Sequence, residues 1–148
     1  MSKYGAKTMR AAILTAALIA LASPALAGEL RVNVTGIRSA TGQVGCALYA
    51  DPRSFLSDAG IAAVRWQPAD PAGVQCRFDN LPPGIYAVAV THDVNGNRRT
   101  DTNLLGMPTE DWGMSNNPRP TLRAPRFDEA AIQVPNGPAV TIEVRLAR

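Results

Sequence analysis

The sequence predicts an all-β fold: a single antiparallel β-sandwich of about seven strands, with Greek-key connections and one long ordered loop. Three observations predict it. Short segments with alternating apolar and polar residues recur along the chain, turns rich in Gly, Pro and Asn separate them, and no long amphipathic helix is present. Six or seven short strands within about 120 residues are typical of a sandwich, because two facing sheets bury their apolar faces against each other.

The first 27 residues match the pattern of a secretory signal peptide. A positively charged start precedes an apolar stretch that ends at Ala27 in an Ala-Leu-Ala sequence, the small-x-small pattern that signal peptidase cleaves. A Ser-Pro pair interrupts this stretch, which is shorter than the roughly 20 residues of a membrane-spanning helix. We therefore expect a signal peptide over residues 1–27 and one β-sandwich domain over residues 28–148. The mature chain should be periplasmic or secreted and have no membrane span.

The charge balance argues against a nucleic-acid partner. The whole chain has 15 basic and 12 acidic residues, but three of the basic residues and none of the acidic ones lie in the predicted leader. The mature chain therefore has as many acidic as basic residues. It also lacks a basic patch with interleaved aromatic residues, which is the usual footprint of a nucleic-acid-binding surface. We expect no nucleic-acid binding; an envelope protein or a glycan is the kind of ligand that suits an exported module.

Six segments have the pattern of strands. The first alternates strictly, with apolar residues such as Leu30 and Val32 on one face and polar residues on the other, which indicates a half-buried strand. The fourth carries apolar residues on both faces, which indicates a central strand. The predicted strands are residues 29–37, 43–50, 74–80, 84–93, 130–134 and 139–147.

Two connections between these strands are long. Residues 51–73 are predicted to be irregular apart from a short helical turn. Residues 93–129 have no convincing strand or helix, yet they contain many large apolar residues, which disordered segments lack. Loops longer than about 15 residues are uncommon in compact domains, and ordered ones are usually functional. We therefore expect the loop over residues 93–129 to pack on the sandwich and to carry the function.

The chain has two cysteines, Cys46 and Cys76, at inward positions of two different predicted strands. In an exported protein an even number of cysteines indicates a disulfide, because the compartment is oxidising. A metal site is a poor alternative, since the sequence has no CxxC motif and a single His. We expect a disulfide between Cys46 and Cys76; two buried free thiols are the alternative.

The long loop begins with oxygen-bearing residues at alternate positions, the spacing with which a short loop surrounds a calcium ion. Leu104 stands where such loops carry a bidentate Glu, so Glu110 or Asp111 would have to complete the shell. The alternative is a cluster of Asx turns, in which Asp and Asn side chains bond their own backbone. Calcium, if bound, would bind weakly, at about 10⁻⁴–10⁻³ M. The candidate metal ligands are Asp93, Asn95, Asn97, the carbonyl group of Arg99, Asp101 and Glu110.

Other polar residues of the loop suggest two further functions. His92 could act with Asp93 and Glu110 as a hydrolase on the same scaffold. No nucleophile elbow surrounds any serine, so we assign no catalytic residue and favour a protein that is not an enzyme. A third hypothesis is an assembly module of the cell envelope. The following polar stretch should either pack or line a groove for a sugar or peptide; it contains Trp112, Ser115, Asn116 and Asn117.

Residues 81–117 carry four motifs in succession: Leu-Pro-x-Gly-x-Tyr-Ala, His-Asp-x-Asn-x-Asn, Leu-Gly-x-Pro-x-Glu and Gly-x-Ser-Asn-Asn. With these motifs and the flanking strands, nearly the whole mature chain resembles a bacterial exported family called domain of unknown function 2141. The resemblance implies a secreted sandwich of the immunoglobulin-like or transthyretin-like type, with no established activity. It favours a functional role for residues 92–117 and strengthens the case for calcium there. One departure is Arg98-Arg99, where family members often carry Gly-Lys.

Overall fold

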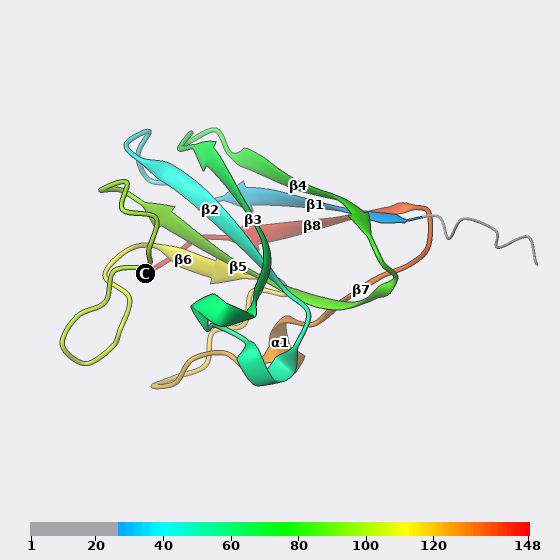
Figure 1. Cartoon of the computed structure of the whole chain (residues 1–148). Coiled ribbons are helices and arrows are strands. Elements are labelled where there is room, and N and C mark those ends of the chain that lie inside the picture. Colours follow the sequence, from blue (N-terminus) through cyan, green and yellow to red (C-terminus); the bar gives the residue numbers. More distant parts are fainter. Residues whose placement is uncertain (1–26) are drawn as a thin grey trace, which may run out of the picture.

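The computed structural model describes residues 27–148, so the predicted signal peptide, except for Ala27, lies outside the described residues. The described chain forms two facing β-sheets (Figure 1), and this confirms the predicted all-β sandwich. One sheet has the strand order β4-β1-β8. The other has the order β3-β2-β5-β6, with β7 paired to β5. The strands are β1 (Gly28–Thr35), β2 (Gln43–Tyr49), β3 (Ile61–Pro68), β4 (Val74–Leu81), β5 (Gly84–Asp93), β6 (Trp112–Met114), β7 (Ile132–Val134) and β8 (Ala139–Arg145).

The structure corrects the prediction for both long connections. Residues 51–73, predicted to be irregular, contain the edge strand β3 as well as two short 3-10 helices, η1 (Pro52–Ser54) and η2 (Asp58–Gly60). The loop over residues 93–129 contains the three-residue strand β6 and runs into the one-turn helix α1 (Phe127–Ala130). One pairing, between β1 and β8, is parallel, whereas the sequence predicted antiparallel pairing throughout.

The core between the sheets follows from the two-residue period of the strands. In β1, Leu30, Val32 and Val34 are buried, while the residues between them are only half-buried, as the alternation predicted. Inward side chains of the five-stranded sheet pack against them. Phe78 on β4, the neighbour of β1 in the same sheet, is the largest fully buried side chain of the described chain. Burying a side chain of this kind stabilises the fold by about 1.5–3 kcal/mol.

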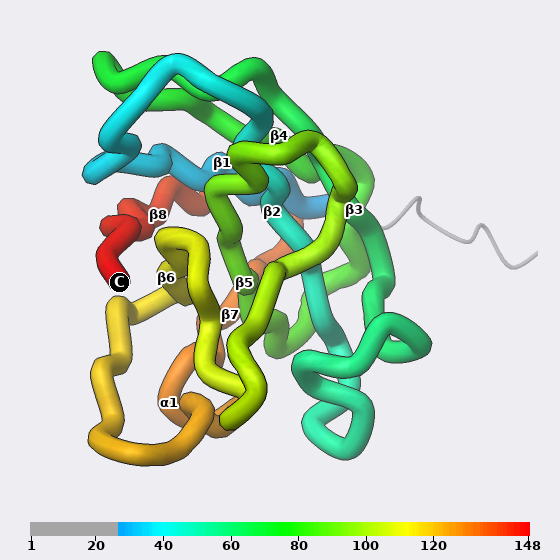
Figure 2. Tube along the Cα trace, turned by 90° about the vertical axis from the view of Figure 1, so that its left-hand side faces the viewer, coloured from blue at the N-terminus to red at the C-terminus, as the bar shows by residue number. Residues whose placement is uncertain are grey.

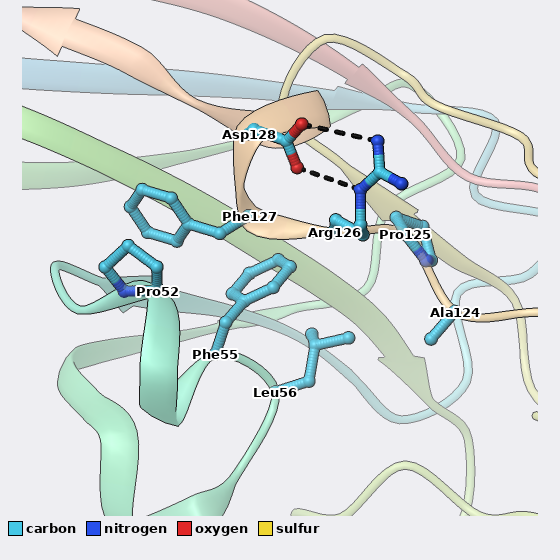
Figure 3. Close-up of a pocket in the computed structure, with 8 residues that line it drawn as sticks. All are labelled: Pro52, Phe55, Leu56, Ala124, Pro125, Arg126, Phe127 and Asp128. Carbon is cyan, nitrogen blue, oxygen red and sulfur yellow. Dashed lines mark hydrogen bonds and ion pairs between the residues drawn. The ribbon is translucent and has the colours of Figure 1, made fainter.

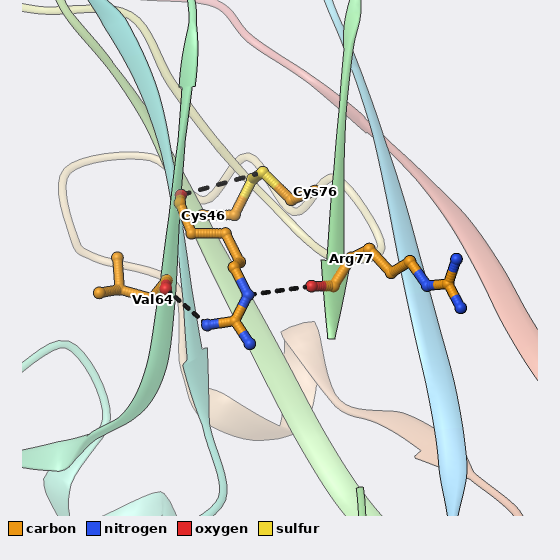
Figure 4. The surroundings of a disulfide bond; sticks show 5 residues. Cys46, Val64, Cys76 and Arg77 are labelled. Carbon is orange, nitrogen blue, oxygen red and sulfur yellow. Dashed lines mark hydrogen bonds between the residues drawn. A yellow bond between two sulfur atoms is a disulfide. The ribbon is translucent and has the colours of Figure 1, made fainter. Parts of the chain in front are cut away.

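A disulfide joins the two sheets across this core (Figure 4). Cys46 on β2 and Cys76 on β4 are both fully buried, with their Cα atoms 6.4 Å apart, so the predicted disulfide is confirmed and links one sheet to the other. Nearby, the Arg65 guanidinium on β3 donates a hydrogen bond of 3.1 Å to the carbonyl oxygen of Arg77 on β4. The disulfide and this hydrogen bond therefore both tie β4 to the five-stranded sheet, the first at β2 and the second at the edge strand β3.

Strand β5 is buried on both faces, as its sequence predicted. Alternate residues of β5 face the core between the sheets, whereas Ala87 and Ala89 face outward. Phe55 and Phe127 cover this outward side and pack edge to face, with ring centroids 5.5 Å apart. The segment after β2 and helix α1 thus form an additional layer over the five-stranded sheet. The last residue of β5, Asp93, is fully buried, and the candidate site begins there.

Candidate functional site

The β5–β6 connection opens with a turn built around the Asp93 carboxylate, which is fully buried. Its Oδ1 accepts hydrogen bonds from the amides of Gly96 (2.8 Å) and Asn97 (3.1 Å), and its Oδ2 accepts one from the amide of Arg98 (2.6 Å). Gly96 and Arg98 have φ values of 74° and 60°, which bend the chain back on itself. The carboxylate thereby pairs three backbone groups of the turn that would otherwise need water.

Two asparagines connect this turn to Asp101. The Nδ2 groups of Asn95 and Asn97 donate to the Asp101 carboxylate at 2.6 and 2.8 Å. Their Oδ1 atoms accept from the amides of Asn97 and Arg99 at 3.1 and 2.8 Å, which are Asx turns. The predicted metal ligands from Asp93 to Asp101 are therefore brought together in one network. Arg99 takes part through its amide, whereas the prediction had assigned its carbonyl group.

Glu110 and Asp111 hold the other end of the connection. The Glu110 carboxylate is buried and accepts from the amides of Val94 (3.0 Å) and Asp101 (3.3 Å), so it bridges the two ends of the loop. The Asp111 carboxylate is also buried and forms a two-pronged ion pair with Arg38, at 2.6 and 2.5 Å. These hydrogen bonds raise the pKa of the Arg38 guanidinium. The loop ends are thus fixed to each other and to the segment after β1.

The geometry of the carboxylates favours the Asx-turn interpretation of this loop. Within residues 27–148, no three His, Cys, Asp or Glu side chains come together as a group able to hold a metal. The oxygens of Asp93 and Glu110 accept from backbone amides, and those of Asp101 accept from side-chain amides. An ionised carboxylate has about four lone-pair sites, and two or three of them are used on each of these groups. A cation would therefore depend on the remaining lone pairs and on amide oxygens.

His92 has a structural role. Its side chain is buried, and Nε2 lies 2.8 Å from the carbonyl oxygen of Thr41, so Nε2 carries the proton and donates it. The carboxylates of Asp93 and Glu110 accept hydrogen bonds from loop amides, and neither carboxylate is hydrogen-bonded to the imidazole. A base in a hydrolase must lie within hydrogen-bond reach of its partners and of the substrate. The geometry gives the hydrolase hypothesis no support.

The serine and the two asparagines after β6 form a clamp rather than an open groove. Ser115 is fully buried, and its Oγ donates to the carbonyl oxygen of Ala130 at 2.5 Å and accepts from the amide of Val88 at 3.0 Å. Asn116 donates to the carbonyl oxygen of Ala131 at 2.9 Å. Asn117 donates to a carbonyl oxygen of β8 at 3.1 Å and accepts from a β8 amide at 2.8 Å. The three residues therefore bind the excursion to β5, to the end of α1 and to β8.

Trp112 packs in the same region. It is half-buried, its side chain contacts the outward face of β5, and the Arg119 guanidinium lies 4.6 Å from its ring centre. Such a cation–π contact contributes about 0.5–1 kcal/mol at an exposed site. The packing alternative that the sequence left open for this stretch accordingly describes Trp112 better than a ligand groove.

Comparison with known proteins places the chain in a family. A family model described as an uncharacterized protein conserved in bacteria, DUF2141, matches residues 32–143. The chain belongs to this family. No curated protein and no solved structure matches it. Among residues 27–148 of this DUF2141 protein, no helix has the length and the apolar character that crossing a bilayer requires.

Three residues that the sequence analysis did not assign to the site, Arg38, Thr41 and Asn103, form hydrogen bonds within it. Thr41 and Arg38 hold His92 and Asp111, but they lie 51 and 73 residues away from them, and no local pattern reveals such pairs. Asn103 is different. Its Oδ1 accepts from the amides of Leu105 (2.9 Å) and Met107 (3.1 Å), a local turn that the Asn-x-x-Gly sequence at this position could have indicated.

An apolar groove lies apart from these residues (Figure 3). It has a volume of about 570 Å³ and is open to solvent. Phe55 and Phe127 form its floor, and the ion pair between Arg126 and Asp128 lies at one edge. None of the site residues predicted from the sequence lines this groove.

Proposed function

We propose that this DUF2141 protein is an exported, non-enzymatic binding or structural module that uses the β5–β6 connection as its binding surface. The observation that carries the proposal is the buried Asp93 carboxylate with its three amide hydrogen bonds. Together with Glu110 at the other end, it orders a loop that the sheets alone would leave free. Preordered loops on a rigid scaffold bind partners well, because little conformational entropy is lost on binding.

We further propose that the Asp/Asn network takes up one calcium ion as a structural ligand. Its charge favours this. Asp93, Asp101 and Glu110 form no ion pair with any cationic side chain among the described residues, and the Arg98 guanidinium instead lies 5.9 Å from the Trp66 ring centre. The network therefore carries negative charge that no cationic side chain of the described residues offsets, and a divalent cation would offset it.

The proposed affinity is low for a geometric reason. Asn95 and Asn97 direct Nδ2 toward Asp101, so each amide must rotate by half a turn before its oxygen can face a cation there. The rotation breaks the two Asx-turn hydrogen bonds, each worth about 0.5–1.5 kcal/mol. This cost, together with only two charged candidate ligands between residues 93 and 101, is consistent with the weak range of about 10⁻⁴–10⁻³ M.

Thermal unfolding with and without calcium tests this proposal. The experiment uses residues 28–148, which contain both sheets and the disulfide. We expect about 5 mM calcium to raise the midpoint by several degrees over the value in chelator, since a ligand at several times its dissociation constant adds about 1–2 kcal/mol. Asp101→Asn should abolish the shift, and Asp58→Asn, an exposed charge elsewhere, should leave it unchanged. An unchanged midpoint in the unsubstituted protein would show that the loop is an Asx-turn structure without a metal.

A further inference from the structure

The tip of the β5–β6 connection, residues 104–107, is apolar and exposed. Leu104, Leu105 and Met107 have relative exposures of 106%, 86% and 50%. No charged residue occurs between Asp101 and Glu110. The connection projects beyond the sheets on the left in Figure 1 and lies in front of them in Figure 2. Three large apolar side chains next to one another on a protruding turn are therefore presented to solvent.

The turn that carries these side chains is ordered, and the amides of Asn103, Leu105, Gly106 and Met107 are paired within it. The Asn103 side chain accepts from the amides of Leu105 and Met107. The Asn103 amide donates to the carbonyl oxygen of Met107, and the Gly106 amide donates to the carbonyl oxygen of Asn103, both at 2.9 Å. Thr102 and Pro108 form an antiparallel bridge at the base of the turn. Entering a medium without water is costly for unpaired backbone groups, and the pairing of these amides lowers that cost.

The small size and convex shape of this tip favour a lipid bilayer over a protein as its partner. A stable protein interface buries about 800 Å² on each side and involves some 20–30 residues, which far exceeds three side chains on a convex turn. A lipid bilayer requires no complementary shape and accepts apolar side chains at a depth of about 5–10 Å. We propose that the Leu104–Met107 tip inserts into the interface of a lipid bilayer and holds the protein reversibly at a membrane surface. This inference rests on the proposed role of the connection as a binding surface.

The expected strength is modest. Two leucines and a methionine bury an apolar area of the same order as a single acyl chain, which binds bilayers with a partition constant of about 10⁴ M⁻¹. Binding at this level is reversible, and it falls when even one of the large side chains is replaced by a polar one. The proposal therefore predicts that polar substitution of the two adjacent leucines, Leu104 and Leu105, lowers the partition constant.

Vesicle flotation tests the proposal with residues 28–148 and vesicles of phosphatidylcholine, alone or mixed with phosphatidylglycerol. We expect the unsubstituted protein to float with both, and Leu104→Ser combined with Leu105→Ser to lower the partition constant at least tenfold. The matched control is Leu122→Ser. Leu122 is 91% exposed but lies outside the tip, so its substitution removes an equally exposed leucine and should leave binding unchanged.

The outcomes separate this proposal from the one for calcium. Failure of the unsubstituted protein to float, or equal flotation of the double variant, overturns membrane insertion. The proposal is also overturned if the unsubstituted protein is a dimer in solution and the double variant is a monomer, because the tip would then pair with a second copy. The double variant should keep the calcium-dependent shift in melting midpoint. If that shift is present but flotation is absent, the membrane inference alone has failed.

Discussion

Replacing both cysteines, Cys46→Ala with Cys76→Ala, is expected to lower the free energy of unfolding by about 3.5 kcal/mol. The bridge closes a loop with a sequence separation of 30 residues, and opening it restores chain entropy to the unfolded state. Because Cys46 and Cys76 lie on different sheets, the change also removes the one disulfide that links the sheets in the described chain. Urea denaturation of the two proteins measures the difference in unfolding free energy, provided that the dependence of this free energy on urea concentration is the same for both.

The reduced protein provides the control for this prediction. Dithiothreitol should bring the unsubstituted protein close to the stability of the double variant, and it should have no effect on the variant itself. A loss of less than 1 kcal/mol in both experiments would contradict the assignment of the disulfide as a major stabilising element in a domain of this size.

Asp93→Ala is expected to lower the free energy of unfolding by about 3 kcal/mol. The substitution leaves the amides of Gly96, Asn97 and Arg98 without their acceptor. Hydrogen bonds to a charged group contribute about 1.5–3 kcal/mol each, and access of water to the opened turn recovers part of the sum. Urea denaturation again gives the value, and the intensity of amide signals from residues 94–101 reports the local loss of order.

Two control variants test whether the loss comes from these hydrogen bonds. Asp93→Asn keeps one acceptor oxygen but places an amide group against the Arg98 N–H, so it should lose about half as much stability as Asp93→Ala. Asn95→Ala removes exposed hydrogen bonds of the same loop and should cost less than about 1 kcal/mol. Equal effects of Asp93→Ala and Asn95→Ala would mean that Asp93 is not the anchor.

The regular strands could be predicted because their burial alternates along the sequence. Strand β1 is the clearest case, with Leu30 and Val32 buried and their neighbours half-buried. Strand β3 could not be found in this way. It lies at a sheet edge, its burial does not alternate, and exposed residues such as Ile61 and Val64 make up much of it. Strand β6 has three residues, and its pairing with residues 89–91 of β5, not its own sequence, makes it a strand.

The candidate site shows the same division between local and distant interactions. The spacing of Asp93, Asn95 and Asn97 predicted that these side chains would gather, because turns of this kind are made by residues within a few positions of one another. The roles of Ser115 and Asn117 could not be predicted, since their partners lie 15 to 28 residues away on other elements. The sequence identified both residues as notable and left packing or a ligand groove open for their stretch, but it could not name the carbonyl and amide groups that they bind.

Amide hydrogen exchange at Gly96, Asn97 and Arg98 tests the central claim, that a buried carboxylate orders the β5–β6 connection. Residue-resolved NMR should show all three amides protected at least tenfold relative to an unstructured chain, with protection lost in Asp93→Ala. Exchange of the three amides at unprotected rates in the unsubstituted protein would contradict the claim. In that case the connection would be a mobile loop, without the fixed surface on which both proposals depend.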